Sequence, residues 1–131
     1  SPVFVPNTDL SDSQVINHQD MSYRRIFWTI NLVYSTKAEQ LENICKDIEN
    51  YINNSDNFVQ NPGQENFVRV TELGSSSIDL TILCYMSVID YTQFSQVKQE
   101  LIFNIMSAVE NHNSDFAFPS RSIYIENQGP E

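Results

Sequence analysis

The sequence predicts an α+β domain of the ferredoxin-like type, with two helices on one face of a four-stranded antiparallel sheet. Residues 24–34 and 77–88 alternate between apolar and polar side chains, which is the period-2 pattern of a strand with one buried face. Residues 38–52 and 94–109 carry apolar side chains at helical spacing. A turn at Gly74–Ser76 joins two extended runs, so the predicted order is β-α-β-β-α-β, a split βαβ plan.

The first strand is expected at 24–34, where one face is consistently apolar. Its inward residues would be Ile26, Trp28, Ile30, Leu32 and Tyr34. Before it, residues 18–22 are polar and are predicted to form a linker. Residues 1–17 show no sustained period, and Val3–Val5 is the only candidate strand there.

The first helix is predicted to begin at Thr36, because Thr36 and Glu39 have the spacing of a capping box. The polar run 53–56 ends this helix. Its inner stripe would comprise Ala38, Leu41, Ile44, Cys45, Ile48 and Ile52.

The two middle strands are expected at 67–73 and 77–88, joined as a hairpin. Gly74 is expected to supply the positive φ that tight antiparallel connections often need. The long strand 77–88 should be central, next to 24–34. The short strand 67–73 carries Arg69 and Glu72, which suit an edge position.

A second helix and a last strand complete the predicted fold. Asp90 or Thr92 is expected to cap the helix. Its inner stripe would comprise Phe94, Val97, Leu101, Ile105, Ala108 and Val109. Pro119 favours an extended approach to the fourth strand, which is expected at Ser122–Glu126.

The sheet face away from the helices is predicted to carry apolar side chains. Phe27, Val33, Leu83 and Tyr85 should lie there. Cover by another chain, or by another part of the same chain, would explain them. Scattered surface hydrophobics are the alternative from the residues alone.

Composition argues against several classes of function. Seven basic and 17 acidic residues give a net charge of −10, which repels phosphate backbones, so no nucleic-acid partner is expected. The sequence has no apolar run of about 18 residues or more, so none of it is expected to span a bilayer. Cys45 and Cys84 lie on predicted inner stripes and are expected to be buried, reduced thiols.

No catalytic, cofactor-binding or metal-binding residues are predicted. The serines after Gly74 lack a nucleophile elbow, and turn chemistry explains them better. His18 and His112 lack a partner at motif spacing, and the helix dipole accounts for a histidine at the end of a helix. The acidic pairs at 9/12 and 47/49 are interpreted as solvated charge.

Three segments carry a resemblance to a known family. The hairpin at 68–78, Val-Arg-Val-Thr-Glu-Leu-Gly-Ser-Ser-Ser-Ile, resembles the cytoplasmic hairpin of the small-conductance mechanosensitive channel (MscS) family. Val5-Pro6-Asn7 followed by Ile16-Asn17 resembles the end of that family's β domain. Phe116–Pro119 followed by Ile123–Ile125 resembles the lead into its final strand, with Ala117 where the family usually has proline.

The resemblance implies a structural role. Residues 1–17 would be the tail of an upstream β domain, and 18–131 the ferredoxin-like α/β cytoplasmic domain. In the family such domains form a homoheptameric vestibule below the pore, through which ions and small solutes leave under membrane tension during osmotic downshock. The pore helix, the attachment to the cell membrane and the tension sensor would lie upstream, and this part alone would be soluble. A stand-alone domain that senses a small ligand, or a small enzyme on the same fold, is the alternative.

Overall fold

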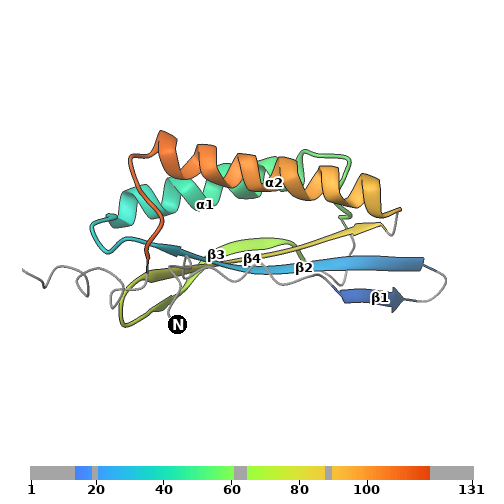
Figure 1. Cartoon of the computed structure of the whole chain (residues 1–131), viewed down its shortest axis with the longest axis horizontal. Coiled ribbons are helices and arrows are strands. Elements are labelled where there is room, and N and C mark those ends of the chain that lie inside the picture. Colours follow the sequence, from blue (N-terminus) through green and yellow to red (C-terminus); the bar gives the residue numbers. More distant parts are fainter. Residues whose placement is uncertain (1–13, 19–20, 61–64, 88–89, 119–131) are drawn as a thin grey trace, which may run out of the picture.

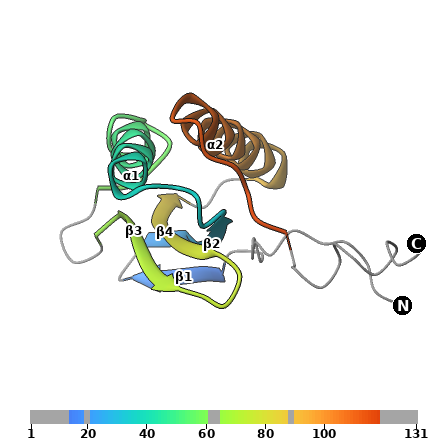
Figure 2. The ribbon, with the colours of Figure 1, turned by 90° about the vertical axis from the view of Figure 1, so that its left-hand side faces the viewer.

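The computed structural model describes residues 14–18, 21–60, 65–87 and 90–118, which form two layers. One layer is an antiparallel β-sheet, and the other consists of two helices that lie side by side on one face of it (Figures 1 and 2). The α+β class and the two helices on one face are therefore confirmed. The elements are β1 (Gln14–His18), β2 (Met21–Leu32), α1 (Ala38–Asn53), β3 (Phe67–Leu73), β4 (Ile78–Ser87) and α2 (Tyr91–Asn111).

The sheet has the strand order β1-β2-β4-β3, and every neighbouring pair is antiparallel. As predicted, the two long strands β2 and β4 are central and β3 lies at an edge. Ile26 pairs with Cys84 and Trp28 pairs with Ile82, so the inward positions of the two central strands face the helices together. This register places the apolar side chains of both strands in one core.

The core lies between the sheet and the helices. The predicted α2 stripe is buried throughout, and α1 buries Ile44, Ile48 and Ile52 completely. Leu41 and Cys45 of the predicted α1 stripe are only partly buried, and Ala38 is exposed. The largest fully buried side chains of the sheet are Trp28, Ile26, Leu32, Leu80, Ile82 and Met86.

Both helices begin one residue before their first turn, but only one begins as predicted. The Asp90 carboxylate accepts a hydrogen bond from the Gln93 backbone N–H at 2.9 Å and caps α2. For α1 the predicted Thr36–Glu39 box is wrong. The Thr36 hydroxyl instead donates to the Val33 carbonyl at 2.7 Å, and the cap lies one residue later.

The predicted polar linker and orphan tail are also partly wrong. Residues 21 and 22 belong to β2, and Gln14–His18 forms β1, which pairs with residues 21–25 of β2. The expectation that this end of the chain lacks strand partners therefore fails for β1. Val3–Val5 lies outside the described residues.

The predicted fourth strand, Ser122–Glu126, lies outside the described residues too. The chain just before it pairs with the other end of β2. Phe116 forms a bridge with Leu32, and the Ala117 N–H donates to the Asn31 carbonyl at 2.8 Å. One edge of β2 is thus shared by β1 and by residues 115–117, which lie far apart in sequence.

The connection between β3 and β4 differs from the prediction at one residue. Gly74 does not adopt a left-handed backbone conformation. A Cβ at this position would instead come within 3.1 Å of the Ser77 carbonyl oxygen, which accepts from the Gly74 N–H at 2.8 Å. Close approach of the two backbones therefore explains the glycine. Tyr34, predicted to face inward, is 47% exposed, and its hydroxyl donates to the Gly74 carbonyl.

Candidate functional site

The serine-rich turn forms a structural polar network. Asn31 is almost completely buried, and its side-chain amide donates to the Ser77 hydroxyl at 3.0 Å and to Asp79 Oδ1 at 2.5 Å. The Ser77 hydroxyl itself donates to the same carboxylate oxygen at 2.8 Å. The network ties the hairpin between β3 and β4 to the end of β2. Because the Ser77 hydroxyl is engaged with a carboxylate and an amide, this geometry is that of a brace rather than of an activated nucleophile.

Neither cysteine has the environment of a reactive thiol. Cys84 is completely buried, which raises its pKa to about 12. Cys45 is partly buried, and burial together with the negative charge of Glu49 raises its pKa to about 11. Both are free thiols, so the prediction of no disulfide is confirmed, although Cys45 is less buried than expected. Thiols with raised pKa values are poor nucleophiles and poor metal ligands at neutral pH.

His112 has a partner that its sequence position did not reveal. It caps the C-terminus of α2, and its Nε2 atom lies 2.7 Å from Asp47 Oδ2 on α1. Gln40 adds a second link between the helices by donating to the His112 carbonyl at 2.6 Å. The contact joins one residue from each helix and thus acts as a clamp. Within the described ranges, no three His, Cys, Asp or Glu side chains gather as a metal site would require.

A groove of about 630 Å³ runs between α1 and the edge strand β3. Its lining is largely apolar but carries charges of both signs: Ala38, Leu41, Glu42, Cys45, Lys46, Glu49, Arg69 and Val70. No glycine lines it, and it lies beside a strand whose pairing is shifted by an irregularity between Val70 and Glu72. A sensor domain was expected to show a polar, glycine-lined pocket, and this groove does not have that character.

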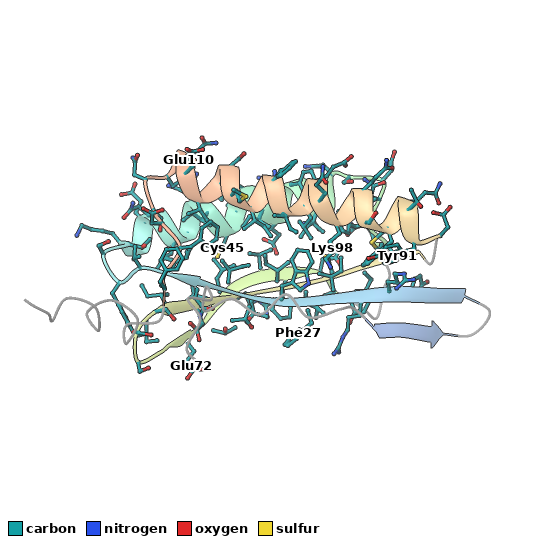
Figure 3. The ribbon with its side chains drawn as sticks, viewed as in Figure 1. Phe27, Cys45, Glu72, Tyr91, Lys98 and Glu110 are labelled. Carbon is teal, nitrogen blue, oxygen red and sulfur yellow. The ribbon has the colours of Figure 1, made fainter. Side chains whose placement is uncertain are left out.

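The open face of the sheet, the face away from α1 and α2, carries an apolar row across three strands. Phe27 of β2 and Phe67 of β3 both pair with Leu83 of β4, so the three side chains form one line, called here the aromatic row. Phe27 is 49% exposed and points away from the helices (Figure 3). The prediction that Phe27 and Leu83 share this face is confirmed, whereas Tyr85 is buried and Phe67 was missed.

Two arginines flank the aromatic row. The Arg25 guanidinium lies over the Phe27 ring, 5.3 Å from its centroid. The Arg69 guanidinium lies over the Phe67 ring at 4.6 Å. Both are cation–π contacts at partly exposed sites. The open face therefore presents an apolar centre with positive charge at two corners, in a chain whose net charge is −10.

A second apolar patch lies on the outer side of α2. Phe103 is 56% exposed and Met106 is 50% exposed, and they are neighbours on the helix surface because they are three residues apart. Glu100 and Glu110, both exposed, lie on either side of this pair in sequence. Glu110 points away from the sheet, on the side of the molecule opposite Phe27 (Figure 3). This α2 patch and the open face are the surfaces of the described residues that suit contact with another polypeptide.

Comparison with a family model identifies the fold of this chain. The model described as "Mechanosensitive ion channel MscS, C-terminal" matches residues 26–116, which is well over half of the chain. The match runs from the middle of β2 to the residue that bridges back to it. It therefore includes both helices, the hairpin and three of the four strands.

Individual relatives agree with that match. An uncharacterized MscS family protein from Aquifex aeolicus is 37% identical over 130 residues, covering 96% of this chain and 34% of the relative. The low conductance mechanosensitive channel YnaI of Escherichia coli is 29% identical over 129 residues, covering 98% of this chain and 37% of that channel. The chain thus spans about a third of the length of these relatives.

Solved structures show the same fold. The closed-state crystal structure of MscS from Helicobacter pylori superposes with a TM-score of 0.58 at 25% identity, covering 79% of this chain and 38% of that one. The cryo-EM structure of Arabidopsis thaliana MSL1 gives a TM-score of 0.65 at 15% identity, covering 77% of this chain and 36% of that one. The second likeness concerns the fold alone.

Proposed function

Because this chain belongs to the MscS family of mechanosensitive ion channels, we propose that it forms part of the cytoplasmic vestibule of such a channel. The match to the family's C-terminal model carries the proposal. That family consists of channels rather than enzymes, and that no turnover occurs here stays a prediction. None of the described helices is long and apolar enough to cross a membrane, so the proposal places the pore helix and tension sensor in other parts of the parent protein.

The proposed assembly is a homoheptamer below the pore. Its vestibule would pass ions and small solutes when membrane tension opens the channel, which protects the cell during osmotic downshock. Two exposed apolar surfaces, the open face and the α2 patch, support assembly with further copies. Residues 1–17 would be the end of an upstream β domain and 18–131 the ferredoxin-like α/β domain, with Ser122–Glu126 as its last strand.

A chimeric channel tests this proposal. Replacing the matching part of E. coli YnaI by this chain should preserve tension-activated current in patch-clamp recordings of the cell membrane. It should also preserve survival of osmotic downshock in cells that lack their own channels, wherever the unaltered relative confers it.

A matched control is the same chimera with Trp28→Asp, which places a charge in the core and should abolish current by unfolding the domain. The proposal would be contradicted by a chimera that reaches the membrane and stays silent at tensions that open the unaltered relative. It would also fail if the parent protein had no membrane-spanning segment.

A further inference from the structure

We propose that the open face of one copy binds the α2 patch of a second copy, head to tail. This inference rests on the proposed assembly and names the two surfaces that carry it. The occupant of the open face is thus the outer side of α2 of a neighbouring identical chain.

The sheet side of this contact is an apolar row between two positive charges. Arg25 and Arg69 lie on strands separated by β4, and their row positions differ by four residues, because Arg25 pairs with Tyr85 and Arg69 with Thr81. Two strand spacings and four residue rises place their Cα atoms about 16 Å apart across the sheet. Both guanidinium groups already stack on row aromatics and are thereby held at the corners of the apolar centre.

The helix side has the matching pattern with opposite charge. Phe103 and Met106 form the apolar centre, and Glu100 and Glu110 lie at its two ends. Ten residues of helix separate the two carboxylates by about 15 Å along the axis. The spacing of the acids therefore matches the spacing of the arginines, so that both charge pairs can form while the apolar centres meet.

Charge favours this pairing over the symmetric one. Two open faces brought together would place four guanidinium groups around one apolar centre, and two α2 patches would place four carboxylates together. Like charges held close to an interface disfavour such contacts, whereas the head-to-tail contact pairs every charge with its opposite. The short range of the charge pairs also makes the contact sensitive to salt.

A head-to-tail contact has a consequence for assembly. Because the two surfaces lie on opposite sides of the molecule, every added copy leaves one open face and one α2 patch unoccupied. Only a closed ring occupies all of them, since heterologous contacts end in rings or in open stacks.

Charge reversal tests the pairing directly. The sheet variant combines Arg25→Glu with Arg69→Glu, and the helix variant combines Glu100→Lys with Glu110→Lys. Light scattering after gel filtration and sedimentation velocity, each over a concentration series at low and high salt, report the oligomer. Each variant alone should weaken association by about tenfold or more, and a 1:1 mixture of the two should restore it. A single chain with all four changes keeps the net charge of −10 and should also associate like the parent chain.

Two controls separate this contact from general effects of charge and greasiness. Lys37→Glu with Lys46→Glu changes the net charge as much as the sheet variant does but lies outside both surfaces, and should leave association unchanged. Phe27→Ser should weaken association, whereas Leu73→Ser, at a position that is more exposed but lies at the hairpin end, should not.

The proposal is overturned if the parent chain is monomeric at every concentration, or if the mixed variants associate as weakly as each alone. It is also overturned if oligomers persist unchanged in both variants, because assembly would then use other surfaces. The last result would leave the proposed channel function intact, since the chimera decides that question separately. Circular dichroism of each variant confirms that the fold is kept before association is compared.

Discussion

Removing the Asn31 side chain should destabilise the domain far more than its single amide would suggest. Asn31→Ala deletes a buried hydrogen bond to the Asp79 carboxylate and another to the Ser77 hydroxyl. A bond to a charged group contributes about 1.5–3 kcal/mol and a neutral one about 0.5–1.5 kcal/mol, so a loss of about 2–4 kcal/mol is expected. The remaining bond from Ser77 to Asp79 keeps the loss from being larger.

Urea denaturation followed by Trp28 fluorescence measures this loss, because the protein has a single tryptophan and it is fully buried. The midpoint should fall while the slope of free energy against urea stays constant. Asn50→Ala, an exposed position on α1, is the matched control and should change stability by less than about 0.5 kcal/mol. If Asn31→Ala behaved like that control, the network would be decorative and the reasoning from its burial would be wrong.

The remaining predictions concern titration, the hairpin and a helix cap. Because burial holds the thiol pKa of Cys84 near 12 and that of Cys45 near 11, the folded state keeps protons that the unfolded state loses above about pH 9, so stability should fall as pH rises from there; Cys84→Ala should flatten this fall, and an unchanged slope would contradict the assignment. Gly74→Ala should cost about 1 kcal/mol in urea denaturation, since its Cβ would press on a backbone oxygen at 3.1 Å, and a neutral outcome would mean the turn yields freely. Asp90→Ala should cost about 1 kcal/mol through loss of the α2 cap, whereas Asp56→Ala, exposed in a loop, should cost almost nothing in the same assay.

Sequence reasoning was most reliable where one face of an element is uniformly apolar. The α2 stripe and the register of β4 follow from periodicity alone, because burial on one side leaves a repeat that local sequence displays. β1 was missed for the opposite reason. Its five residues include only two apolar ones, and its strand character comes from pairing with β2, which no local pattern shows.

Details that depend on tertiary contacts were likewise out of reach. Thr36 matches a capping motif, but its hydroxyl lies within 2.7 Å of both the Val33 carbonyl and the Ser114 hydroxyl, and the latter comes from the far end of the chain. Phe67 looked like an ordinary edge residue until the register placed it in line with Phe27. The candidate surfaces are thus properties of register and helix orientation, and composition alone indicated only that some apolar residues would remain exposed.

The shared edge of β2 also determines how a pulling force would travel through this domain. β1 grips residues 21–25 of that strand, and residues 115–117 grip its other end near Leu32. A load applied between the two flanking segments therefore runs lengthwise along β2 and is resisted there by cross-strand hydrogen bonds. α1, α2 and the hairpin lie beside this path rather than on it, so they can shift or repack while the distance between the two points of attachment stays fixed by one strand.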